Sequence, residues 1–141
     1  MPTAANWSSP ATATDANAPS VLIVDDDPDI LAALGELLES EGYQVTMVTD
    51  ARAALSHLRD GMRPCVILLD LMMPNMDGFE FLYQLRANPD WRGIPTVVIT
   101  AKELTPEERF HLTGSVEKIL SKGAFTRDEL LSNVRELIKR I

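Results

Sequence analysis

Short apolar runs that end in aspartate, threonine or lysine constrain the fold of this chain more than any other feature. Residues 21–24 lead into three consecutive aspartates, residues 65–69 are apolar throughout and lead into Asp70, and residues 94–100 form a third run. A strand with no polar face is typical of a parallel sheet that is covered on both sides. The runs therefore predict the central strands of a parallel sheet.

Helix signals separate these runs. Asp27 and Pro28 are residue types that begin helices, and the apolar residues that follow them over 30–38 lie on one helical stripe. Comparable patterns predict four more helices and two weaker strands. The helices are expected from Asp50 to about Asp60, over 79–87, over 106–113 after Thr105, and from Thr126 to Ile141; the strands are expected over 43–48 and 116–120.

Five strand–helix units predict an α/β fold. Strands that alternate with helices at this spacing are joined by right-handed crossovers into a parallel sheet. The number of units and the domain length favour a flavodoxin-like, doubly wound, five-stranded parallel sheet of order 2-1-3-4-5 with five helices. We expect one domain over residues 21–141. Residues 1–20 are mostly Ala, Ser, Thr, Pro and Asn, and this composition predicts a disordered tail or linker.

Composition excludes several classes of protein. The chain has 13 Lys and Arg residues against 21 Asp and Glu residues, and its net charge of −8 repels phosphate backbones and anionic lipid surfaces. We therefore expect neither nucleic acid nor a membrane as a direct partner. A lone cysteine, Cys65, cannot form an internal disulfide or a Cys-based zinc site. Without a signal peptide or an apolar run of membrane-spanning length, the expected location is the cytoplasm.

The side chains at the strand ends form a chemical set. In an open parallel sheet, ligands bind beyond the carboxyl ends of the strands at the point where the strand order reverses. Clustered carboxylates repel one another unless a cation lies among them, and an all-oxygen site suits Mg²⁺ or Mn²⁺. A carboxylate can also accept a phosphoryl group, whose oxygens then need positive charge and hydrogen-bond donors. The strand ends supply Asp25, Asp26, Asp27, Asp70, Thr100 and Lys122.

Each of these residues also has a plain structural explanation. An aspartate before a helix is usually an N-cap, which is the role we expect for Asp27. Asp70 alone could cap the turn that follows it, Thr100 alone could be an ordinary strand-end hydroxyl, and Lys122 alone could be a surface cation. The functional hypothesis is favoured because the plain explanations would have to hold at four strand ends at once.

The same residues resemble the receiver domain of two-component response regulators. The matching segments occur in the family's order and extend over nearly all of the chain after the tail. They are VLIVDDDPDI, VILLDLMMPNMDGFEFL, IPTVVITAK and ILSKGAF. The segment LLDLMMPNMDG is the most specific of them.

The resemblance implies a role for each site residue. Asp70 is the phosphoacceptor. Asp26 is a direct ligand of Mg²⁺, Asp25 acts mainly through a metal-bound water, and the backbone carbonyl of Met72 completes the ligands that the protein supplies. Thr100 is the switch hydroxyl, and Lys122 pairs with a phosphoryl oxygen. The implied donor is a phosphohistidine on a sensor histidine kinase or a phosphotransfer protein. Such a domain transfers phosphate only to its own aspartate, which it usually also dephosphorylates slowly, and is not otherwise an enzyme.

Two residues depart from the family pattern. The family usually has a proline after the lysine, with a cis peptide bond between them, whereas this chain has Gly123. We expect the bond between Lys122 and Gly123 to be trans, because a cis bond before a non-proline residue costs about 2.5–4 kcal/mol. An aromatic residue commonly lies three positions before the lysine and rotates with the threonine. Ile119 occupies that position and has no ring to rotate.

Several functions stay open at this point. Because the last helix runs to the C-terminus, we expect no output domain, and the domain could act alone by contact, act as a relay intermediate or be a fragment of a hybrid sensor histidine kinase. A phosphatase of the haloacid dehalogenase type would use Asp25 and Asp27 as nucleophile and acid, but it would leave Asp70 unexplained. A receiver-like scaffold that never uses phosphate is the third alternative. The target, the stimulus and the oligomeric state are not predicted.

Overall fold

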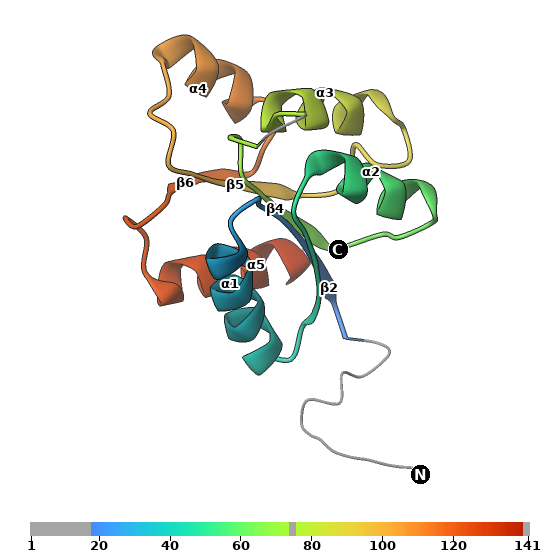
Figure 1. Cartoon of the computed structure of the whole chain (residues 1–141), viewed down its shortest axis with the longest axis vertical. Helices are drawn as coiled ribbons and strands as arrows, with labels where there is room; N and C mark the ends of the chain where they lie inside the picture. Colours follow the sequence, from blue (N-terminus) through green and yellow to red (C-terminus); the bar gives the residue numbers. More distant parts are fainter. Residues whose placement is uncertain (1–17, 74–75, 140–141) are drawn as a thin grey trace.

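The computed structural model describes residues 18–73 and 76–139. Most of the predicted tail over residues 1–20 lies outside the described residues. The described part contains five parallel strands and five helices that alternate along the chain (Figure 1). The strands are β2 (Ser20–Val24), β3 (Gln44–Val48), β4 (Val66–Leu69), β5 (Thr96–Thr100) and β6 (Lys118–Ser121).

The sheet has the order β3-β2-β4-β5-β6, which is the predicted order 2-1-3-4-5. Every neighbouring pair is parallel. The two central strands β2 and β4 are in register, so that Val24 pairs with Leu69 at their carboxyl ends. Consequently the residues that follow these two strands lie beside each other at one edge of the sheet.

The helices form one layer on each face of the sheet (Figure 1). They are α1 (Pro28–Ser40), α2 (Ala51–Arg59), α3 (Gly78–Ala87), α4 (Pro106–Thr113) and α5 (Arg127–Lys139). One hydrophobic core lies between the sheet and α2, α3 and α4. A second core lies between the other face of the sheet and the helices α1 and α5. β4 contributes to both cores, with Ile67 and Leu69 on one side and Val66 and Leu68 on the other, which explains its continuous apolar sequence.

Capping side chains set the beginnings of the helices as the sequence predicts. Asp27 accepts the backbone N–H of Asp29 at 2.9 Å, and Asp50 accepts that of Ala53 at 2.8 Å. Reciprocal capping boxes begin the last two helices, each with a threonine side chain and a glutamate three residues later. These pairs are Thr105 with Glu108 and Thr126 with Glu129.

Two strands begin two residues later than predicted, and the other strand boundaries differ from the predicted ones by at most one residue. β5 begins at Thr96 rather than at residue 94, because the N–H of Ile94 donates to the Trp91 carbonyl and closes the preceding turn. β6 begins at Lys118 rather than at residue 116, because the N–H of Val116 donates to the Leu112 carbonyl at the end of α4.

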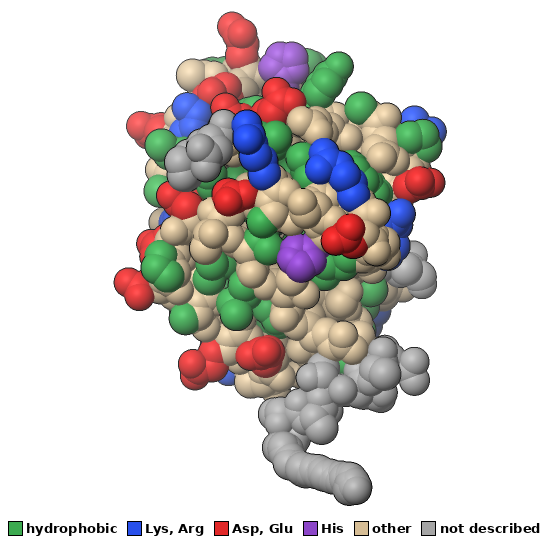
Figure 2. All heavy atoms as spheres, turned by 45° about the vertical axis from the view of Figure 1, so that its right-hand side comes forward, with side chains coloured by type: hydrophobic (Ala, Val, Ile, Leu, Met, Phe, Trp, Pro, Cys, Tyr) green, Lys and Arg blue, Asp and Glu red, His purple; other side chains and the backbone are tan. Residues whose placement is uncertain are grey.

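The surface carries charges of both signs. On the face in Figure 2, the Lys and Arg side chains lie among Asp and Glu side chains and do not form one basic patch. Within residues 18–73 and 76–139, none of the helices has the length and apolarity needed to cross a bilayer.

Candidate functional site

Backbone hydrogen bonds place three of the predicted site residues at the same edge of the sheet. The N–H of Asp25 donates to the Val48 carbonyl at 3.1 Å, and the N–H of Asp70 donates to the Val24 carbonyl at 2.9 Å. The N–H of Lys122 donates likewise to the Thr100 carbonyl at 2.9 Å. Each residue lies just beyond a strand. Its backbone hydrogen bond to the neighbouring strand fixes the position of the Cα from which its side chain projects.

The carboxylates of Asp25, Asp26 and Asp70 lie together. One oxygen from each falls within 4.8 Å of the others. Asp25 and Asp70 are 2% and 3% exposed, whereas Asp26 is exposed to solvent. Two buried carboxylates and one solvent-facing carboxylate make an all-oxygen donor set of the kind that Mg²⁺ binds while it keeps several waters.

Lys122 bridges the two buried carboxylates. Its Nζ lies 2.9 Å from Asp25 Oδ2 and 3.3 Å from Asp70 Oδ2. Burial alone would lower the pKa of the Lys122 ammonium, but the hydrogen bond to Asp25 and the charges of both aspartates outweigh that effect and raise the pKa. Lys122 is therefore a permanent positive charge in the site at neutral pH.

Burial opposes the ionisation of the Asp70 carboxylate, and here the opposing interactions do not outweigh it. Burial raises its pKa, and the nearby Asp25 charge adds to the rise. The backbone N–H of Met72, which donates to Asp70 Oδ1 at 3.2 Å, acts in the opposite direction, as does Lys122. The carboxylate that the sequence marks as the acceptor thus lies in an environment that favours added positive charge.

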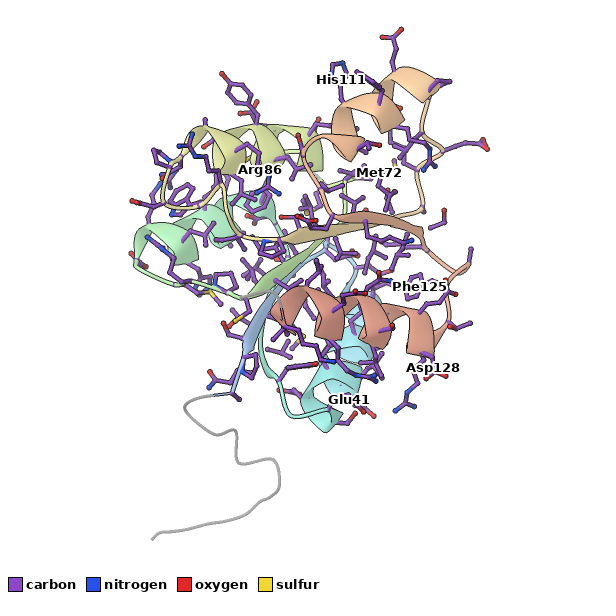
Figure 3. All side chains as sticks on the ribbon, turned by 180° about the vertical axis from the view of Figure 1, so that it is seen from behind. Glu41, Met72, Arg86, His111, Phe125 and Asp128 are labelled. Carbon is purple, nitrogen blue, oxygen red and sulfur yellow. The ribbon has the colours of Figure 1, made fainter. Side chains whose placement is uncertain are left out.

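The remaining predicted residues lie around this cluster. Thr100 is 2% exposed at the end of β5, and its Oγ1 accepts the N–H of Lys102 at 3.0 Å. Met72 lies shortly after Asp70 in the sequence, and its side chain is 55% exposed. Figure 3 shows this side chain near the end of the sheet below α4. Asp27 does not join the carboxylate cluster, since its side chain caps α1. That position argues against the phosphatase hypothesis, which needs Asp27 as an acid.

Gly78 is a supporting residue whose role the sequence did not reveal. Its N–H donates to the Leu71 carbonyl at 2.9 Å, so that the loop after Asp70 and the first turn of α3 lie against each other. A Cβ at this position would lie 2.6 Å from Leu71 Cα and 2.8 Å from the Asp70 carbonyl oxygen. Only glycine allows the two backbone segments to approach this closely. The turn sequence before α3 predicts a bend, but it does not predict which backbone the bend touches.

The two departures from the family pattern have clear structural positions. Among the described residues there is no cis peptide bond, so the predicted trans bond before Gly123 is confirmed. Gly123 has a φ of +79°, a left-handed conformation that side-chain-bearing residues rarely adopt. Ile119 is half-buried and packs against the core on the α2, α3 and α4 side.

The chain belongs to the response regulator receiver domain family, whose model matches residues 21–135. It is 35% identical over 120 residues to the DNA-binding response regulator MtrA of Mycolicibacterium smegmatis, a match that covers 85% of this chain and 50% of that protein. It is 33% identical over 122 residues to response regulator Rre1 of Synechocystis sp., with 86% and 52% covered. The chain therefore spans about half the length of these curated relatives.

Solved receiver domains share the fold. The signal receiver domain of a signal transduction histidine kinase from Syntrophus aciditrophicus has a TM-score of 0.79 at 30% identity, with 88% of this chain and 92% of that chain covered. The receiver domain of sensor histidine kinase PA1611 from Pseudomonas aeruginosa has a TM-score of 0.76 at 28% identity, with 86% and 98% covered. That structure has a magnesium ion coordinated in its active site cleft.

Proposed function

We propose that this domain accepts a phosphoryl group on Asp70 in a Mg²⁺-dependent reaction and so acts as a phosphorylation-controlled switch. The single observation that carries the proposal is the juxtaposition of the Asp25, Asp26 and Asp70 oxygens within 4.8 Å, with Lys122 bonded to two of these carboxylates. Membership of the receiver family supports the same assignment. Outside this self-modification, we propose no turnover of free substrates.

The donor set fits a hard divalent cation. Asp25, Asp26 and Asp70 offer oxygen ligands without histidine or cysteine, and the burial that raises the pKa of Asp70 favours added positive charge there. We assign Asp26, Asp70 and the Met72 backbone carbonyl as direct protein ligands for Mg²⁺, or for Mn²⁺ in its place, and Asp25 as a ligand that acts mainly through a metal-bound water. When bound, the ion supplies positive charge to the oxygens of the transferring group.

Asp70 supplies the nucleophile. A carboxylate oxygen forms a bond to phosphorus while the bond between phosphorus and the donor's imidazole nitrogen breaks; the electron pair stays on that nitrogen, which takes up a proton. Lys122 Nζ is already 3.3 Å from Asp70 Oδ2 and can pair with an oxygen of the arriving group. The Thr100 hydroxyl can donate to another oxygen, since it is buried at the adjoining strand end.

The proposed partner is a protein that carries a phosphohistidine, either a sensor histidine kinase or a phosphotransfer protein. We propose that phosphorylation reorganises residues 101–115 and that this segment, with the adjoining face of α5, contacts a downstream protein. The net charge of −8 argues against nucleic acid as a direct partner of this domain. Action of this domain by direct contact with a downstream protein is our first model. The receiver of a hybrid sensor kinase is the second, and the solved receivers of histidine kinases favour it.

The metal assignment can be tested with a matched pair of variants. Purified protein is incubated with acetyl phosphate over a Mg²⁺ titration, and the phosphorylated fraction is measured by intact mass. Asp26→Asn should lose phosphorylation, because it removes a carboxylate from the cluster. Asp29→Asn removes the same charge from the exposed first turn of α1 and should behave as wild type. Equal phosphorylation of wild type and Asp26→Asn would show that the metal assignment is wrong.

A further inference from the structure

The C-terminal end of α4 is firmly attached to the rest of the domain. Leu112 is the one buried residue of this helix. Just beyond the helix, the Ser115 carbonyl accepts hydrogen bonds from two guanidinium nitrogens of Arg86, a half-buried residue of α3. The same guanidinium donates to the carbonyls of Arg92 and Ile94 at 3.0 and 3.1 Å. Figure 3 shows Arg86 between α3 and the sheet, and its Nη2 also donates to Thr96 Oγ1 in β5 at 3.2 Å, so that this end of α4 is connected to both.

The N-terminal end of α4 is held by a more exposed contact. Lys102 Nζ lies 3.3 Å from Glu108 Oε2, and the two side chains are 31% and 29% exposed. The other carboxylate oxygen of Glu108 accepts the N–H of Thr105 at 3.0 Å and completes the capping box. One carboxylate therefore caps the first turn of α4 and binds the loop that precedes the helix.

This exposed contact is connected to the candidate phosphorylation site. The N–H of Lys102 donates to the Thr100 hydroxyl oxygen at 3.0 Å. If the hydroxyl turns toward a phosphoryl group on Asp70, this hydrogen bond has to lengthen or change direction. The backbone of Lys102 would move with it, and the Lys102 side chain would either draw Glu108 along or release it.

We propose that the Lys102–Glu108 ion pair transmits the reorientation of Thr100 to the first turn of α4, which then moves about the end held by Arg86. The inference rests on the proposed function and specifies its path through the protein. A signal of this kind needs interactions that differ between two states, and the pair supplies one such difference. A partly exposed ion pair shifts the equilibrium between two conformations by at most about fivefold. The pair therefore couples the two segments but does not by itself hold α4 in one position.

A charge-removing variant that keeps the cap tests this path. Glutamine also serves at the third helical position of a capping box, so Glu108→Gln removes the ion pair while the cap of α4 remains. Glu107→Gln removes the same charge from the same turn and is the matched control. Hydrogen exchange is measured over residues 101–115 with Mg²⁺, with and without beryllium fluoride as the phosphoryl mimic. Binding of beryllium fluoride is measured separately by titration.

We expect wild type and Glu107→Gln to change protection over residues 103–110 when beryllium fluoride binds. Glu108→Gln should bind the mimic with an affinity within about twofold of wild type, yet show a response over 103–110 that is weaker by up to about fivefold. Lys102→Gln should behave as Glu108→Gln does. Equal responses in wild type and Glu108→Gln would overturn the coupling and leave the proposed function standing. Failure of wild type to bind beryllium fluoride would overturn both.

Discussion

Replacing Gly78 by alanine should damage the site from a position that carries no functional group. The added Cβ would lie 2.6 Å from Leu71 Cα and 2.8 Å from the Asp70 carbonyl oxygen. Both are backbone atoms, so no side chain can rotate to make room. Ordinary contact begins at 3.4 Å, and the loop after Asp70 would therefore have to move by nearly 1 Å.

The cost follows from this overlap. Forcing an extra carbon into a packed region costs about 1–3 kcal/mol, and the better helix propensity of alanine returns at most about 1 kcal/mol. The expected loss in the free energy of unfolding is about 1–2 kcal/mol, which for a domain of this size lowers Tm by about 4–8 °C. The phosphorylated fraction should fall by more than the loss of folded protein alone would cause, because the displaced segment begins at the phosphoacceptor itself.

Two other glycines provide controls. A Cβ at Gly93 meets nothing within 4 Å, and a Cβ at Gly35 meets the Sδ of Met47, the end of a flexible, 44% exposed side chain. Gly93→Ala and Gly35→Ala should therefore be neutral or stabilising by up to about 1 kcal/mol. Thermal unfolding and acetyl phosphate labelling are measured on all three variants. If Gly78→Ala matches the two controls in both assays, the packing argument is refuted.

Two further changes should alter stability. Arg86→Met should lower the free energy of unfolding by about 1–3 kcal/mol, because it leaves the partly buried carbonyls of Ser115 and Ile94 without their hydrogen-bond donor. Arg92→Met, at an exposed position, should cost under about 0.5 kcal/mol. Urea denaturation checks this, and equal losses would contradict it. Asp70→Asn should raise Tm at pH 7 in EDTA, because the raised pKa of Asp70 makes its ionisation oppose folding. That penalty is absent below the ordinary pKa of 3.8 and develops as the pH rises through the higher folded-state pKa, so the advantage of Asp70→Asn should vanish near pH 3; an advantage that persists there would contradict the assignment.

The fold was predictable because its signals are local. Apolar runs without polar faces, caps such as Asp27 and Thr105, and the order of strands and helices all appear in short stretches of sequence. The cluster of Asp25, Asp70 and Lys122 was predictable for a related reason, since parallel strands bring their carboxyl ends to one edge. The strand boundaries were less accurate, because the hydrogen bonds of turns and helix ends determine where pairing begins.

The supporting contacts could not be predicted from the sequence. Arg86 reaches the carbonyl of Ser115 across 29 positions of sequence, and nothing in the local pattern marks either residue. The close approach at Gly78 depends on how the loop after Asp70 folds back on the start of α3. Both contacts are tertiary, and each depends on the packing of elements whose individual patterns do not encode it.

The most direct test of the central claim is to map the phosphorylated residue. Protein incubated with acetyl phosphate and Mg²⁺ is digested, and the modified peptide is identified by mass spectrometry, with EDTA and the Asp70→Asn variant as controls. The proposed function predicts a single phosphoryl group on Asp70 that is absent in EDTA and absent from Asp70→Asn. Phosphate on another residue, or none on Asp70 while Mg²⁺ is present, would contradict it.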